Sequence, residues 1–81
     1  GSEMCIRDSP ARHEVYVTHR NARQISVIDA NTYSLKHTIK TAAMPNSMVL
    51  SPDSKTLFVS VKQDEKTNKA DYVLKLDLTQ F

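Results

Sequence analysis

Two parts of this 81-residue chain repeat each other, and that repeat constrains the fold more than any other feature. A Ser-Pro turn at 9–13 leads into a segment at 14–19 that is rich in Val and Tyr, and a second Ser-Pro turn at 51–55 leads into a similar segment at 56–61. The turn and the segment both recur after 42 residues, because 51 − 9 = 42 and 56 − 14 = 42. A repeat of about 40 residues is typical of proteins built from stacked copies of one structural unit.

The next segment, at 24–29, recurs at 71–78 with a larger offset, since Asp77 answers Asp29 and 77 − 29 = 48. The six additional residues fall in the polar and charged loop at 62–71, which we expect to be exposed. Asp29 and Asp77 stand at equivalent strand ends, where an aspartate typically caps a turn with its carboxylate. We therefore predict a turn-capping role for both.

Short strands are the elements that the composition favours, because Val, Thr, Tyr and Ile are frequent and no 3.6-residue apolar stripe competes. The segment at 34–40 alternates apolar and polar residues, which fits an outer, edge-like strand. Adjacent apolar residues at 48–50 and 57–59 predict sheets that are covered on both faces. The expected strands are 14–19, 24–29, 34–40, 47–51, 56–61 and 71–78.

This pattern predicts an all-β fold, specifically a fragment of a β-propeller with about one and a half blades of antiparallel strands. We expect 9–41 to form a partial blade with strands two to four. We expect 42–81 to form the following, C-terminal blade with strands one to three, including loop 62–71. Residues 1–8 do not fit the strand pattern and resemble a translated adapter or a cloning remnant, so we expect a non-native leader of arbitrary conformation. A native N-terminal arm is the alternative.

Composition argues against several classes of function. A net charge of +2 is too small to indicate a nucleic-acid partner by itself. No apolar run approaches the roughly 18 residues that span a membrane, so we expect no membrane insertion. The three histidines lack zinc-like spacing, and Gly-x-Ser-x-Gly and glycine-rich phosphate loops are absent. We therefore predict no catalytic residue, no metal site and no cofactor.

Three phrases of the sequence resemble the YVTN-type β-propeller repeat. They are Tyr-Val-Thr-His at 16–19, Ser-Val-Ile-Asp at 26–29 and Ser-Pro-Asp-Ser-Lys-Thr-Leu-Phe-Val at 51–59. The corresponding phrases of the repeat are Tyr-Val-Thr-Asn, Ser-Val-Ile-Asp and Ser-Pro-Asp-Gly-Lys-Thr-Leu-Tyr-Val. His19 replaces the family asparagine, and Ser54 replaces the turn glycine at a cost of about 1 kcal/mol if its φ is positive.

The resemblance implies a seven-bladed propeller in the intact protein, exported to the periplasm and acting in binding rather than in catalysis. Similarity to the C-terminal part of a bacterial member of the family also suggests DNA as a ligand. The remaining blades of the same propeller would then be partners of this piece. The alternative is an enzyme or cofactor-carrying propeller, lactonase-like or of the haem d1 type, whose active site lies on blades absent here.

The candidate site lies in the loops that follow second and fourth strands, because in propellers these loops share one rim. Arginine and lysine side chains on such a rim could contact phosphates. A solvated polar rim is the alternative, favoured by the shortage of exposed aromatic side chains on which bases could stack. The candidate rim for single-stranded DNA or another anionic ligand consists of His19, Arg20, Asn21, Arg23, Asn46, Lys62, Lys66 and Lys69.

Overall fold

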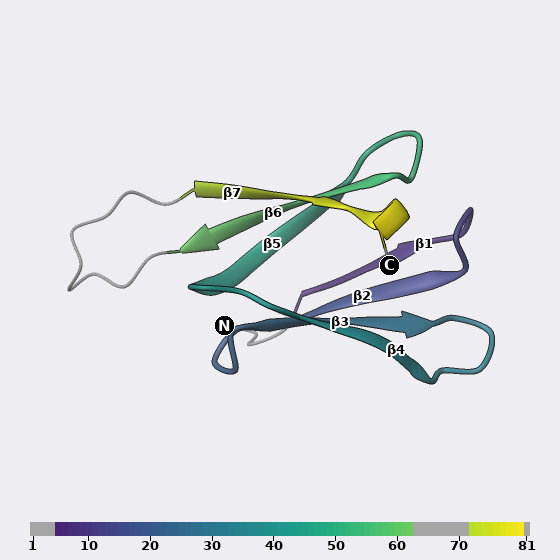
Figure 1. The fold of residues 1–81 in the computed structure, drawn as a ribbon, viewed down its shortest axis with the longest axis horizontal. Helices are drawn as coiled ribbons and strands as arrows, with labels where there is room; N and C mark the ends of the chain where they lie inside the picture. Colours follow the sequence, from purple (N-terminus) through teal and green to yellow (C-terminus); the bar gives the residue numbers. More distant parts are fainter. Residues whose placement is uncertain (1–4, 63–71, 81) are drawn as a thin grey trace.

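The computed structural model describes residues 5–62 and 72–80, which form two antiparallel sheets and almost no helix (Figure 1). The all-β prediction is therefore confirmed. The first sheet has the order β1 (Ile6–Ser9), β2 (Glu14–His19), β3 (Gln24–Asp29) and β4 (Leu35–Lys40). The second has the order β5 (Met44–Leu50), β6 (Thr56–Lys62) and β7 (Tyr72–Asp77), followed by the 3-10 helix η2 (Leu78–Gln80).

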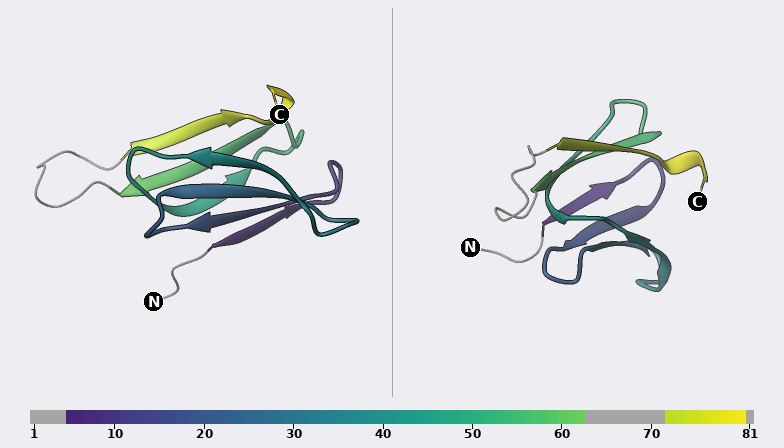
Figure 2. Two further views of the ribbon diagram at one scale, coloured as in Figure 1. Left: turned by 60° about the horizontal axis from the view of Figure 1, so that its bottom comes forward. Right: turned by 60° about the vertical axis from the view of Figure 1, so that its left-hand side comes forward.

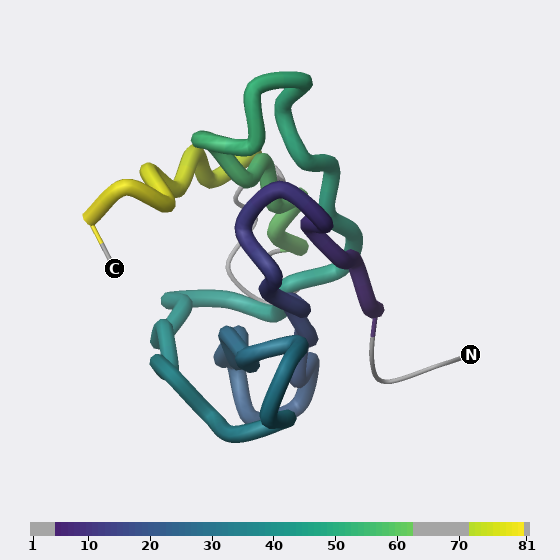
Figure 3. Tube along the Cα trace, turned by 90° about the vertical axis from the view of Figure 1, so that its right-hand side faces the viewer, coloured from purple at the N-terminus to yellow at the C-terminus, as the bar shows by residue number. Residues whose placement is uncertain are grey.

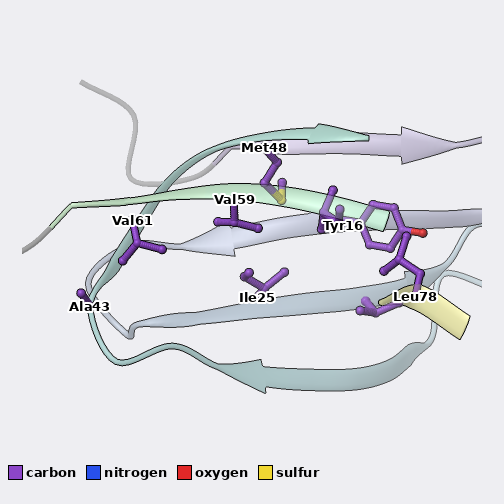
Figure 4. Packing of buried hydrophobic residues seen from close by; sticks show 9 residues of the cluster. Tyr16, Ile25, Ala43, Met48, Val59, Val61 and Leu78 are labelled. Atoms are coloured by element: carbon purple, nitrogen blue, oxygen red, sulfur yellow. The ribbon is translucent and has the colours of Figure 1, made fainter. Parts of the chain in front are cut away.

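The two sheets lie one over the other as two layers (Figure 2), and the view along the strands shows them as separate parts of the trace (Figure 3). Their facing sides bury one apolar cluster between them (Figure 4). The first sheet contributes Tyr16, Ile25 and Val27, and the second contributes Met48, Leu57, Val59 and Val61, while Ala43 and Leu78 complete the cluster. Burial of each large side chain of this kind contributes roughly 1.5–3 kcal/mol, so the layer between the sheets is the core.

The sequence repeat is also a structural repeat, because hydrogen bonds recur with the two offsets. The backbone N–H of Ala30 donates to the His13 carbonyl at 2.8 Å, and the N–H of Leu78 donates to the Lys55 carbonyl at 2.8 Å. The strand positions agree as well. β2 and β3 have the predicted bounds, and the other predicted strands differ from the observed ones by one to three residues at their ends.

The conformation of residues 6–8 differs from the one that we expected. We expected an arbitrary conformation at 1–8, but Ile6–Ser9 forms β1 and pairs antiparallel with β2, so the first sheet has four strands rather than three. Arg7 also donates from Nε to the Met48 carbonyl at 2.9 Å, which ties β1 to the second sheet. The physical reason is that an uncovered strand edge presents unpaired N–H and C=O groups, and a neighbouring segment can pair with them whatever its side chains. Residues 1–4 lie outside the described part.

Pro45 lies inside β5, where it pairs with Val61, so this strand begins three residues before the predicted start at 47. The register shifts between Pro45 and Ser47, which leaves Asn46 as the extra residue of a bulge. A proline without an N–H is tolerated here because β5 is an edge strand of the second sheet and because the bulge already interrupts the ladder.

Only one face of the second sheet is covered. Val49 and Val73 are each 62% exposed and Phe58 is 36% exposed, although the adjacent apolar residues in these strands predict cover on both faces. β4, by contrast, behaves as predicted, because it is an edge strand and its side chains are mostly exposed.

Glu14 is a buried carboxylate that links the two sheets through Arg12. Its side chain accepts hydrogen bonds from Arg12 Nε at 3.1 Å, from Tyr16 Oη at 2.8 Å and from Lys36 Nζ, while Arg12 Nη2 donates to the Leu78 carbonyl at 2.7 Å. Burial raises the pKa of Glu14, but the hydrogen bonds from Lys36, Tyr16 and Arg12 outweigh burial and hold that pKa below its usual 4.5. Burial and the neighbouring carboxylate raise the pKa of Tyr16, so the phenol remains a donor.

A first prediction concerns Glu14. Because the pKa of Glu14 is lower in the folded state, its stabilising effect is complete above the unfolded value of about 4.5 and is lost as the pH falls through the folded value. We expect Glu14→Gln to lower the free energy of unfolding by about 1–3 kcal/mol at neutral pH and to flatten its decline in acid. Urea titrations between pH 3 and 7 measure both effects.

The matched control is Asp8→Asn, which removes an exposed carboxylate that takes part in no ion pair among the described residues. This change should stay within about 0.5 kcal/mol of the parent chain. An unchanged acid profile in Glu14→Gln would contradict the role given to Glu14.

A second prediction concerns Ser54, whose φ of 61° confirms the strain suspected at this turn. Ser54→Gly should raise the free energy of unfolding by up to about 1 kcal/mol, because glycine has no Cβ to clash at positive φ. The control is Lys55→Gly at the next turn position, which lacks a positive φ and should lose stability. Equal shifts of the two denaturation midpoints in the same direction would rule out the strain.

Candidate functional site

Most of the predicted rim residues gather at one end of the two sheets. β2 ends at His19, β3 begins at Gln24, β4 ends at Lys40 and β6 ends at Lys62, and all of these points lie on the left of Figure 1. Lys40 was missed by sequence reasoning. It joins the rim through strand register, because Lys40 pairs directly with Gln24, the residue that follows the Arg20–Arg23 turn.

The described carboxylates are confined to one end of the strands, where Arg12, Lys36 and Lys55 also lie, whereas the described charged side chains at the other end are all cationic. Four cationic side chains lie at this end, and we call them the basic end: Arg20, Arg23, Lys40 and Lys62. None of the four forms an ion pair with a described carboxylate. Every acidic residue in 5–62 and 72–80 lies toward the opposite end, and they are Asp8, Glu14, Asp29, Asp53 and Asp77. Among the described residues, the basic end therefore gathers cations that no described ion pair neutralises, while Asp64, Glu65 and Asp71 belong to the loop at 63–71, outside the described residues.

The turn between β2 and β3 holds its arginines by backbone contacts. The N–H of Arg23 donates to the Arg20 carbonyl at 3.3 Å, and Arg23 has a φ of 56°. The N–H of Thr41 donates to the Arg23 carbonyl at 2.9 Å, and the Thr41 hydroxyl donates to the Ala43 carbonyl at 2.7 Å. This turn is thereby fastened to the link that enters β5, whose first residue, Met44, pairs with Lys62. The arginines and Lys62 belong to one connected framework.

The His19 side chain is less available to a ligand than the arginine side chains, because it already forms a hydrogen bond within the sheet. Its Nε2 lies 2.9 Å from Oγ of Ser26, a residue that is only 7% exposed, and the imidazole is partly buried. This pair does not form a serine nucleophile with its base, because the hydroxyl is buried and the sequence lacks a nucleophile elbow. We interpret the contact as a structural hydrogen bond across β2 and β3.

Asn21 is exposed in the arginine turn, and Asn46 is exposed at the bulge of β5. A bulge turns a side chain away from the strand alternation, and bulges are frequent beside binding sites. The prediction that Asn46 belongs to the rim agrees with its place at the same end of the second sheet as Lys62. Lys66 and Lys69, the two remaining rim predictions, lie outside the described residues.

Asp29 and Asp77, two carboxylates at the opposite end, accept hydrogen bonds from residues close to them in the sequence. Asp29 Oδ1 accepts the N–H of Asn31 at 2.8 Å, and Asp77 Oδ1 accepts the N–H of Thr79 at 2.9 Å, which confirms the predicted turn caps. The hydroxyl of Ser51 lowers the pKa of the Asp53 carboxyl, and the hydroxyl of Thr79 lowers that of Asp77. Within 5–62 and 72–80, no group of three or more His, Cys, Asp or Glu side chains is arranged to hold a metal ion.

Aromatic side chains do not gather at the basic end in the described part of the chain. Tyr33 is 81% exposed, but it lies in the turn between β3 and β4 at the opposite end, and Tyr16 is fully buried. Phe58 is partly exposed on the open face of the second sheet. An anion at the basic end would therefore meet cations and backbone rather than a stacking platform. A search of the described residues for a helix long and apolar enough to cross a membrane finds none.

Comparison with curated proteins finds two similar sequences. The chain is 44% identical over 81 residues to the uncharacterized protein YncE of Salmonella typhi and, to the same extent, to that of Salmonella typhimurium. Each alignment covers 95% of this chain and 23% of the relative. No family model matches the chain. The chain is thus similar to YncE and spans about a quarter of the length of the curated relatives it matches.

Proposed function

We propose that this chain is part of a β-propeller of the YVTN type, and that its basic end binds an anionic ligand without catalysis. Single-stranded DNA is the ligand that we propose to test. The observation that carries the binding proposal is the gathering at one end of the sheets of four cations that form no ion pair with a described carboxylate, while all described carboxylates lie toward the other end.

The propeller proposal rests on how the two sheets pack. The buried face of the first sheet presents Tyr16 and Thr18 of β2, which are 0% and 1% exposed. The repeat offset of 42 maps these residues to Phe58 and Ser60, which lie on the open face of the second sheet and not on its buried face. The two sheets therefore meet through different faces. Packing of this head-to-tail kind can be continued by further sheets into a ring or a filament.

The lengths of the relatives support the same proposal. YncE of Salmonella is about four times as long as this chain, since the alignment covers 23% of it. Such a length leaves room for several more sheets of the size seen here, which would cover the open faces and add a fourth strand beside β7. Propellers close with about four to eight sheets. The YVTN-like phrases favour seven, and they are also the basis for proposing export to the periplasm.

Binding of nucleic acid at the basic end would depend on phosphate contacts. The described cations are exposed or partly exposed, and lysine or arginine contacts to phosphates release counterions whatever the base sequence. Because no stacking platform lies beside them in the described part of the chain, we expect binding that tolerates many sequences and weakens steeply with salt.

The test uses the 81-residue chain and a fluorescein-labelled oligothymidylate, with binding followed by anisotropy between 25 and 200 mM NaCl. If all four cations contact phosphates, the slope of log K against log salt should be about −2.8, which is four times the single-strand value of about −0.7. Arg20→Gln/Arg23→Gln should weaken binding and bring the slope to about −1.4.

Lys55→Glu is the matched control, because it also lowers the net charge by two units but lies in the turn between β5 and β6 at the opposite end. It should leave the slope near the parent value. Absence of binding at 25 mM NaCl, or an equal effect of the double variant and Lys55→Glu, would overturn the proposed site.

A further inference from the structure

We propose that Thr41 is a positioning residue of the anion site, because its hydrogen bonds hold the cations of the first sheet in place relative to Lys62 of the second. The inference rests on the proposed function, since it concerns the same basic end. Lys40 ends β4, and Arg20 and Arg23 lie in the turn between β2 and β3, so all three belong to the first sheet. Lys62 is the last residue of β6 in the second sheet. A ligand that contacts all four cations therefore has to bridge the two sheets.

The chain passes from one sheet to the other beside this site. β4 ends at Lys40 and β5 begins at Met44, so the link consists of residues 41–43 and lies at the basic end (Figure 1). Thr41, the first residue of the link, is 8% exposed, and Ala43, the last, is 4% exposed. Because both ends of the link are buried, the polar groups there need hydrogen-bond partners within the protein.

The backbone of Thr41 holds the arginine turn. Its N–H donates to the Arg23 carbonyl at 2.9 Å. Arg23 has a φ of 56°, and a residue other than glycine remains in this left-handed region only when the surrounding structure holds it there. Thr41 supplies one such contact, and it directly follows Lys40, which pairs with Gln24 at the end of the same turn. Thr41 thus connects Lys40 to the arginine turn.

The side chain of Thr41 acts on the passage to the second sheet. Its hydroxyl donates to the Ala43 carbonyl at 2.7 Å, and this hydrogen bond is buried. Ala43 belongs to the apolar cluster between the sheets and precedes Met44, which pairs with Lys62. A buried carbonyl that loses its donor pays the full cost of leaving water, so the hydroxyl strongly favours one conformation of the link. That conformation sets where β5, and with it Lys62, lies relative to the arginines.

This bracing matters for ligands that contact both sheets. Packed sheets lie about 10 Å apart, which is farther than one phosphate group reaches. A chain of phosphates held by one sheet meets the cation of the other at a high effective concentration when the distance between them is fixed. A loose link would have to be ordered on binding, and that ordering lowers the affinity. A single phosphate ion, held by one sheet, gains nothing from the bracing.

The test is Thr41→Val in the 81-residue chain, which removes the hydroxyl but keeps the branched side chain and the N–H that bonds Arg23. We expect oligothymidylate to bind about three- to tenfold more weakly at 25 mM NaCl, as measured by anisotropy. The affinity for inorganic phosphate, measured by NMR titration of the arginine side chains, should stay within about twofold of the parent value. A smaller folded fraction would weaken both ligands equally, so this comparison distinguishes positioning from stability.

Two further variants serve as controls. Thr41→Ser retains a hydroxyl and should bind oligothymidylate as the parent chain does. Thr38→Val removes an exposed hydroxyl from β4, the strand that leads into the link, and should leave both affinities unchanged. Circular dichroism checks that each variant keeps its strands. If Thr41→Val fails to fold, Thr41→Ala removes the same hydroxyl with a smaller side chain and allows the same comparison.

Amide hydrogen exchange adds a measurement without ligand, in which residues 41–44 of Thr41→Val should exchange faster than those of the parent chain. Absence of oligothymidylate binding by the parent chain would overturn the proposed function and the positioning role together. Parent binding that Thr41→Val leaves unchanged, or weakens equally for oligothymidylate and phosphate, would overturn the positioning role alone. Unchanged exchange at residues 41–44 would also overturn it, because the hydroxyl would then not hold the link.

Discussion

The contact between two unlike sheet faces is the interaction on which the rest of this structure depends. Tyr16, Ile25 and Val27 of the first sheet meet Leu57, Val59 and Val61 of the second, and these six side chains are at most 1% exposed. Neither sheet has a second covered layer of this quality, so the strands are held by this single layer and by the links across it. Because the layer joins different faces, Val49, Phe58 and Val73 remain exposed on the outer side of the second sheet, whereas Val17 and Ser26 on the outer side of the first sheet are only 8% and 7% exposed.

Polar contacts at the two ends of the layer differ in kind. At one end, Glu14 gathers Arg12, Lys36 and Tyr16, and Arg12 reaches the Leu78 carbonyl of the second sheet. At the other end, cations have no described carboxylate beside them and only backbone bonds fasten their turn. The charged side chains that stabilise the fold around Glu14 therefore lie at the opposite end from the cations that we propose to bind a ligand. This separation is what gives the proposed anion site its physical basis.

Much of the fold could be predicted because its signals are local. Asp29 and Asp77 cap turns through their own backbone neighbours, and Ser54 takes the positive φ that a glycine position implies. The predicted strands were confirmed for the same reason, since alternation and β-branched residues act along a short stretch. The sequence-based predictions were wrong where the conformation of a segment depends on residues that are distant in the sequence. Ile6–Ser9 became a strand because the edge of β2 needed one, and Pro45 entered β5 because a bulge made room for it.

By itself, the sequence determined the strand positions, the turns, the repeat and the cationic residues of the β2–β3 turn, because each depends on residues that are close together along the chain. Only the tertiary structure decided which face of each sheet is buried, that Lys40 shares an end with Arg20 and Arg23, and that Glu14 binds Lys36 and Arg12. Those outcomes depend on the packing of one sheet on another and on strand register. A repeat in the sequence does not specify which face of one sheet will pack against the next sheet. The structure shows that this is set by the two apolar faces that fit together between the sheets.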